Sequence, residues 1–183
     1  RFGIPGDFCL FVSTIEPRKN VPTLLRAFRQ LLDSYHPDVK LVLAGERGWL
    51  FDEVFTLVRE LDLVNDCVFL GRVSSEELLW LYNAAQVLVA PSIYEGFGLT
   101  PLEAMACGTP VIVSNVSSLP EVVADAGIKV DPADVEELTV AIWRVLSDCE
   151  LRTSLREKGL KRAAVCSWAK AARGTLAVYH SLR

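Results

Sequence analysis

Short apolar runs alternate along this chain with longer stretches in which apolar residues recur at helical spacing. Strands that are buried on both faces read as continuous apolar runs, and a helix between successive runs is the order that βαβ units require. The alternation therefore predicts an α/β fold with a doubly wound, Rossmann-like, six-stranded parallel sheet. The strands are expected at residues 8–13, 39–44, 67–70, 87–90, 111–113 and 128–130.

Helical patterns fill the segments between these runs and continue beyond the last one. Asn20 is placed to cap the first helix, and Ser74 or Ser75 to cap the third. No repeat, low-complexity tract or linker divides the sequence, so residues 1–183 are expected to form one domain. Ligands of such sheets bind beyond the carboxyl ends of the strands. The helices are expected at residues 21–34, 50–61, 75–84, 101–107, 119–124, 135–147, 151–165 and 168–182.

Charge and composition exclude several classes of protein. The 19 basic and 23 acidic residues give a net charge of −4, whereas a nucleic-acid binder needs a basic face. No apolar run reaches the roughly 18 residues that a membrane-spanning helix requires. The five cysteines are scattered without a C-x-x-C pair, which indicates reduced thiols and a cytoplasmic protein. The chain begins without Met, so it is expected to be a fragment of a longer protein.

Two adjacent cations, Arg18 and Lys19, lie in the loop after the first predicted strand, just before a helix begins. The positive end of a helix dipole disfavours cations, so a phosphate bound between them would explain their presence. A solvated surface turn is the alternative interpretation, because exposed pairs of cations are common.

A glycine-punctuated loop at residues 94–100 follows the fourth predicted strand and leads into a helix. Glycines let backbone N–H groups approach a ligand closely, and a helix N-terminus adds unpaired donors and a positive dipole end. A diphosphate suits such a loop. The spacing matches neither the dinucleotide-binding fingerprint nor a P-loop.

Two carboxylates, Glu95 and Glu103, flank this loop. Carboxylates repel phosphate, so the role that suits them is to accept hydrogen bonds from the hydroxyls of a ribose and a sugar. Residues 100–103 also have the pattern of a capping box with Pro101 at the first helical position, and locally this is the favoured interpretation of Glu103. For Glu95 the alternative is an exposed loop acid.

Other residue types offer little catalytic or metal-binding chemistry. The two histidines, His36 and His180, have no partner that suggests catalysis or a metal site. No carboxylates cluster as in a Mg²⁺ site, so no metal is expected. No cofactor is expected either. The four tryptophans are expected to pack in the core or to dock helices: Trp49, Trp80, Trp143 and Trp168.

The segment from Glu95 to Gly108 closely resembles the group 1 (family 4) glycosyltransferases of the GT-B architecture, which carry two glutamates separated by seven residues. Further matching motifs extend the resemblance over essentially the whole chain. It is a resemblance to the C-terminal, donor-binding half of these two-domain enzymes, so the N-terminal acceptor domain is expected to be absent from this chain. The further motifs lie at residues 16–20, 44–45, 69–71, 119–121 and 131–132.

The resemblance implies a role for each matched residue. Arg18 and Lys19 would bind the donor diphosphate and stabilise it as it departs, while Glu95 would face the transferred sugar. Glu103 would hold the ribose hydroxyls, which outweighs a capping role without excluding it. The resemblance also implies direct donor contacts for the glycine-punctuated loop and the start of the following helix: Gly96, Phe97, Gly98, Leu99 and Thr100. Two residues after the third strand, Arg72 and Val73, would lie along the base.

The implied activity is the retaining transfer of a hexose to a glycan or lipid-linked acceptor, with peripheral membrane association of the full-length protein. The turn at residues 14–20 looks like that of mannosyltransferases that use GDP-mannose, and a UDP-sugar is the alternative donor. A non-catalytic nucleotide-sugar-binding module and a nucleotide-sugar epimerase of related GT-B shape are competing hypotheses.

The last predicted helix carries one apolar stripe. Trp168, Ala172, Leu176 and Tyr179 recur at spacings of four, four and three residues. This stripe either packs on the sheet of the same domain or, as the resemblance implies, crosses back to the N-terminal domain.

Overall fold

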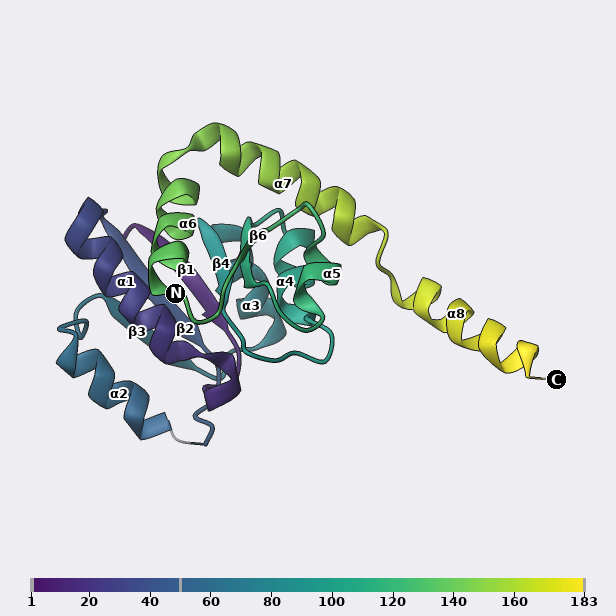
Figure 1. Cartoon of the computed structure of the whole chain (residues 1–183), viewed down its shortest axis with the longest axis horizontal. Coiled ribbons are helices and arrows are strands. Elements are labelled where there is room, and N and C mark those ends of the chain that lie inside the picture. The colour runs from purple at the N-terminus through teal and green to yellow at the C-terminus, as the bar shows by residue number, and fades with distance from the viewer. Residues whose placement is uncertain (1, 50, 183) are drawn as a thin grey trace.

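The computed structural model describes residues 2–49 and 51–182 (Figure 1). All strand pairs are parallel, and the sheet order β3-β2-β1-β4-β5-β6 confirms the predicted six-stranded, doubly wound sheet. Because the direction of winding reverses between β1 and β4, the switch point lies between these two strands. The strands are β1 (Asp7–Val12), β2 (Val39–Ala44), β3 (Cys67–Gly71), β4 (Val87–Ala90), β5 (Val111–Ser114) and β6 (Ile128–Val130).

Helices cover both faces of the sheet. Successive residues of β1 point to opposite faces, so Cys9 and Phe11 join the core under α1, α2 and α6, whereas Phe8 and Leu10 join the core under α3, α4 and α5. Helix α7 packs across α4 and α6. The helices are α1 (Val21–Tyr35), α2 (Phe51–Glu60), α3 (Ser75–Ala84), α4 (Leu99–Ala106), α5 (Leu119–Val123), α6 (Val135–Ser147), α7 (Cys149–Ala164) and α8 (Trp168–Ser181), with a 3-10 turn, η1 (Pro17–Lys19). Leu50, the first residue of the second predicted helix, lies outside the described residues.

The start of α4 corrects the predicted capping box at residues 100–103. The helix begins at Leu99, and its N-cap is Gly98 in the left-handed conformation, with φ of 103° and no side-chain cap. Glycine adopts this conformation without the steric cost of a Cβ, so the chain enters the helix two residues before Pro101. A capping box does form where Ser74 and Glu77 exchange hydrogen bonds at the start of α3.

Three of the four tryptophans lie outside the core, and the fourth docks two helices as predicted. Trp49 and Trp168 are 73% and 81% exposed, and Trp80 is also exposed, so none of the three belongs to the core. Trp143 on α6 stacks on Tyr35 of α1 with ring centroids 4.6 Å apart, as expected of a residue that docks helices. Apolar periodicity places these rings on one side of a helix without deciding whether another element covers that side.

The five cysteines are free thiols, as the sequence predicted. Burial, reinforced by Asp7, raises the pKa of Cys9 to about 12. Burial and Asp66 together outweigh Lys40 and raise the pKa of Cys67 to about 12. Neither of these two thiols is therefore a nucleophile at neutral pH.

Helix α8 extends away from the sheet (Figure 1) and has no buried residue. The stripe residues Trp168, Leu176 and Tyr179 are all exposed. The alternative in which this helix packs on the sheet of its own domain is therefore wrong. Within the described residues, no helix is long and apolar enough to cross a membrane.

Hydrogen exchange on this chain will distinguish α8 from the core helices. A helix without tertiary packing is only marginally stable, so the amides of α8 are expected to exchange faster than those of α4, by about 100-fold or more. Mass spectrometry on peptides that cover residues 168–179 and 102–106 measures the difference. Equal protection in the two peptides would show that α8 belongs to the core of this domain.

Candidate donor site at the switch point of the sheet

The loops after β1 and β4 meet at the switch point, and the Asn20 side chain joins them. Its amide nitrogen donates to the carbonyl oxygens of Pro91, 3.1 Å away, and of Pro132, 2.7 Å away, which lie after β4 and β6. The backbone N–H of Ile93 also donates to the Arg18 carbonyl at 2.8 Å. Asn20 occupies the predicted N-cap position of α1, but its side chain does not cap the helix. The Asn20 side chain instead joins loops that are far apart in sequence, and the local sequence pattern did not reveal this role.

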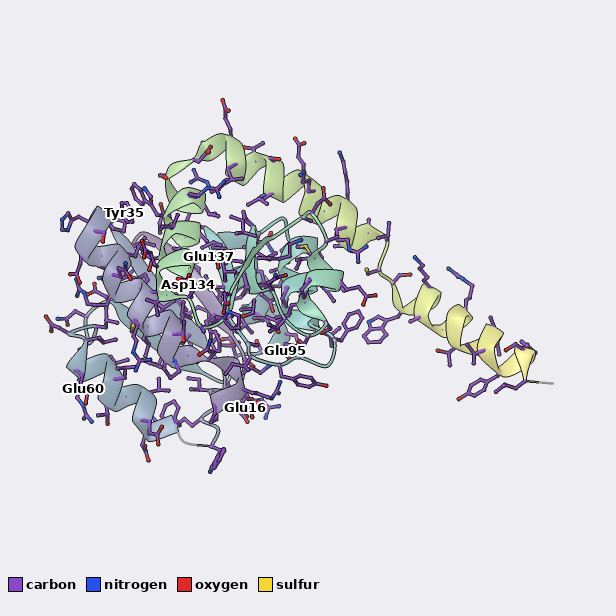
Figure 2. The ribbon with its side chains drawn as sticks, in the orientation of Figure 1. Glu16, Tyr35, Glu60, Glu95, Asp134 and Glu137 are labelled. Atoms are coloured by element: carbon purple, nitrogen blue, oxygen red, sulfur yellow. The ribbon has the colours of Figure 1, made fainter. Side chains whose placement is uncertain are left out.

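Glu95 brings the two predicted cations together. Lys19 Nζ lies 2.5 Å from Glu95 Oε1, and Arg18 Nη1 lies 3.2 Å from Glu95 Oε2. The Ser92 hydroxyl donates to Glu95 Oε1 at 2.8 Å, and Arg18 Nε is 2.6 Å from Glu16 Oε1. Figure 2 shows Glu16 and Glu95 on the same edge of the domain. Arg18, Lys19 and Glu95 thus form one charged cluster, although Glu95 lies 76 or more residues from the two cations in sequence.

Burial differs among the three charged side chains of this cluster. The Lys19 side chain is 10% exposed and that of Glu95 17%, whereas that of Arg18 is 48% exposed. Burying a lysine ammonium without a counter-ion is costly, so Glu95 is the group that makes the buried position of Lys19 tolerable. The interpretation of Lys19 as part of a solvated surface turn is therefore wrong, and so is that of Glu95 as a free loop acid.

The Glu95 carboxylate is held in its charged form. Burial alone raises its pKa, but hydrogen bonds from Lys19 and Ser92 and the charges of Lys19 and Arg18 outweigh burial and keep the pKa below its ordinary value. A carboxyl with a lowered pKa in the folded state adds stability above its unfolded pKa, and that stability is lost as the pH falls through the folded value. The Glu95 carboxylate is therefore ionised at neutral pH.

The loop between Glu95 and α4 is held by two serines that follow β5. The Ser117 hydroxyl accepts from the Glu95 N–H at 3.0 Å, and the Ser118 hydroxyl contacts the carbonyls of Glu95 and Phe97 at 3.0 and 2.8 Å. A Cβ on Gly98 would come within 3.0 Å of Leu119, so the loop also packs closely on α5. The sequence analysis did not single out these serines. Their position directly after a predicted strand, where ligand-binding loops are expected, was the signal that could have identified them.

The N-terminus of α4 opens directly after this loop. Its first backbone N–H groups, including those of Leu99 and Thr100, have no acceptor within the helix, so this end is suited to an anion. Phe97 and Leu99 are about half exposed. Together with Glu103 and with Trp168 of α8, they line an apolar pocket of about 520 Å³.

Glu103 lies on α4 and faces α3 rather than its own helix terminus. Its Oε2 accepts a hydrogen bond of 3.0 Å from the Tyr82 hydroxyl. Burial of the phenol, followed by the charge of Glu103, raises the pKa of Tyr82, so the phenol remains a donor. An exposed carboxylate whose position is fixed by a neighbouring helix can accept hydrogen bonds from a ligand. No feature of the sequence indicated that Tyr82 would contact Glu103.

Arg72 and Val73 follow β3 and line a separate pocket of about 360 Å³. Ser13 and Gly45, at the ends of β1 and β2, contribute to the same pocket. The ends of three adjacent strands therefore form this second pocket, and the loop after β1 runs from it to the cluster of Arg18, Lys19 and Glu95. Within residues 2–49 and 51–182, no three His, Cys, Asp or Glu side chains gather as a metal site.

Comparison with known proteins agrees with this geometry. The family described as "Glycosyl transferases group 1" matches residues 5–162. The O-antigen chain mannosyltransferase B of Escherichia coli is 42% identical over 175 residues, which are 96% of this chain and 46% of that protein. The chain thus spans less than half the length of this curated relative.

Two solved structures are similar in sequence and in fold. Sucrose-phosphate synthase from Thermosynechococcus elongatus superimposes with a TM-score of 0.87 at 34% identity, over 97% of this chain and 46% of that one. The C-terminal domain of the group 1 glycosyltransferase LpcC from Francisella tularensis gives 0.78 at 28% identity, over 88% of this chain and 87% of that one. The chain belongs to the group 1 glycosyltransferases, and its fold is that of their C-terminal GT-B domain.

Proposed function

We propose that this chain is the donor-binding domain of a retaining hexosyltransferase that takes mannose from GDP-mannose. The cluster of Arg18, Lys19 and Glu95 at the switch point is the observation that carries the proposal. A buried lysine and an adjacent arginine, beside the loop that opens α4, provide the positive charge that a diphosphate requires. The relatives named mannosyltransferases support mannose as the sugar.

The charged cluster supplies the chemistry of the transfer. The leaving nucleoside diphosphate gains negative charge as its bond to the sugar breaks, and fixed cations and helix amides stabilise that charge without reorganising. Arg18 and Lys19 act as the cations, with the amides of Gly98, Leu99 and Thr100 opposite them. The fixed cations provide the charge stabilisation that a metal ion supplies in other transferases.

Glu95 changes partners during this reaction. In the described structure its carboxylate neutralises both cations. A diphosphate that takes over these cations releases the carboxylate, which then accepts hydrogen bonds from hydroxyls of the transferred sugar. Glu103, positioned by Tyr82, holds the ribose hydroxyls.

The remainder of the enzyme completes the active site in this proposal. An N-terminal domain supplies the acceptor surface for a glycan or lipid-linked substrate, and the apolar stripe of α8 packs against it. The full-length protein works in the cytoplasm, in peripheral contact with the membrane where a lipid-linked acceptor resides. By itself, this chain binds donor but transfers no sugar.

Calorimetry with GDP, UDP and ADP tests the proposed function. The chain is expected to bind a nucleoside diphosphate, and Lys19→Ala is expected to weaken that binding by roughly 1 to 3 kcal/mol, the range for a charge-assisted contact. Lys158→Ala is the control, because Lys158 forms an exposed ion pair with Asp125 on the surface. Failure of all three nucleotides to bind would refute a donor-binding role, and steady sugar transfer by this chain would refute the need for a second domain.

Replacing Glu95 tests the exchange of partners. Glu95→Gln removes the internal anion that competes with the diphosphate, so nucleoside diphosphate is expected to bind more tightly, by about 1 kcal/mol. Glu60→Gln, on the exposed side of α2, is the matched control. Weaker binding to the Glu95 variant would show that the carboxylate assists the nucleotide rather than competing with it.

Glu103→Gln separates ribose binding from a structural role. The glutamine oxygen can still accept from Tyr82, so the melting temperature is expected to stay nearly unchanged while affinity for the nucleoside diphosphate falls by roughly 1.5 to 3 kcal/mol. Pyrophosphate, which lacks ribose, is expected to bind both proteins equally. An equal loss for pyrophosphate would contradict a ribose contact.

A further inference from the structure

The pocket at the ends of β1, β2 and β3 contains a charged pair that the proposed function has not yet used. Glu46, directly after Gly45, lines the pocket together with Arg72. Arg72 Nη1 lies 3.2 Å from Glu46 Oε1, with both side chains largely exposed. The pocket is thus bordered by an acceptor-only group and a donor-only group, side by side.

Backbone hydrogen bonds fix where these two side chains start. The Ile15 N–H donates to the Glu46 carbonyl at 2.9 Å, and the Gly45 N–H donates to the Gly71 carbonyl at 2.8 Å. A Cβ on Gly45 would lie only 1.8 Å from the Ser13 carbonyl oxygen, so the loops after β1 and β2 are in direct backbone contact there. Residues 46 and 72 are therefore carried by connected, close-packed loops rather than by independent mobile ones.

Separating the exposed Glu46–Arg72 ion pair requires little free energy. Solvent-exposed pairs of this kind contribute little to stability, because water and salt screen them. A planar ligand with matching donors and acceptors can therefore replace the Glu46–Arg72 contact at little cost. Each group then gains a directional, charge-assisted hydrogen bond in place of a screened one.

Guanine has the edge that this pair complements. Its O6 and N7 atoms are adjacent acceptors, which a guanidinium contacts through two N–H groups. Its N1–H and 2-amino groups are adjacent donors, which a carboxylate can accept together. Uracil offers one N–H between two carbonyl oxygens, and adenine has no donor at N1. Uracil and adenine would each leave Glu46 facing an acceptor.

We propose that Glu46 and Arg72 select guanine, with Glu46 accepting from N1–H and the 2-amino group and Arg72 donating to O6 and N7. This assignment rests on the proposed donor-binding function and deepens it, because it specifies which nucleotide the site takes and which carboxylate distinguishes it. Glu46 is then a specificity-determining residue that takes no part in the transfer.

Inosine diphosphate, which differs from GDP only in lacking the 2-amino group, provides the sharpest test. Calorimetry on the original chain is expected to give GDP an affinity about tenfold above those of UDP and inosine diphosphate. Glu46→Gln is expected to bring GDP and inosine diphosphate to about the same affinity and to change UDP affinity by less than about twofold. Asp125→Asn, in the exposed pair with Lys158, is the charge-matched control and is expected to leave all three affinities unchanged.

The other outcomes are distinct. Equal or tighter binding of UDP than of GDP by the original chain would overturn the assignment of Glu46 while leaving a donor-binding function intact. An equal loss of GDP and inosine diphosphate affinity in Glu46→Gln would also overturn it, because the carboxylate would not then contact the 2-amino group. Absence of binding by every nucleotide would overturn the proposed function and the selection of guanine together.

Discussion

A buried ammonium group needs a counter-charge, and at the switch point of this sheet Glu95 provides it for Lys19. The pairing connects the loop after β1 to the loop after β4, and the Ser92 hydroxyl shares the same carboxylate oxygen. Asn20 adds neutral hydrogen bonds that bring in the loop after β6. The charged cluster is therefore held by several loops. A site that acts by electrostatic stabilisation needs such support, because its effect depends on fixed positions of the charges.

Such a cluster can stabilise the folded domain and also bind a diphosphate. Without a ligand, the carboxylate compensates the cations; with a diphosphate bound, the phosphate oxygens can do so, and the carboxylate becomes available to a sugar. Like charges cannot occupy the same position, so the two anions exclude each other from the cations. In this scheme, donor binding and the placement of Glu95 are a single event.

The two halves of the proposed donor site differ in burial and in the contacts that they offer a ligand. The charged cluster is partly buried and, in the proposed function, attracts any diphosphate, whereas Glu46 and Arg72 are exposed and are proposed to discriminate by hydrogen-bond pattern. Strength from phosphate contacts and selectivity from the base edge are a common division in nucleotide recognition. The strand order places the two halves at neighbouring loops, because β1 contributes to both.

The sequence alone determined the sheet, the order of its elements and the loops that carry the site, because alternating apolar patterns and glycine-rich turns are local properties. It also placed Arg18, Lys19 and Glu95 near a common edge. Only the tertiary structure decided which groups meet: Glu103 contacts Tyr82 instead of capping α4, and Asn20 joins loops instead of capping α1. The apolar stripe of α8 shows the same limit, since periodicity predicts which residues share a face but not whether another element covers it. Pairings between residues far apart in sequence depend on the packing of the whole chain.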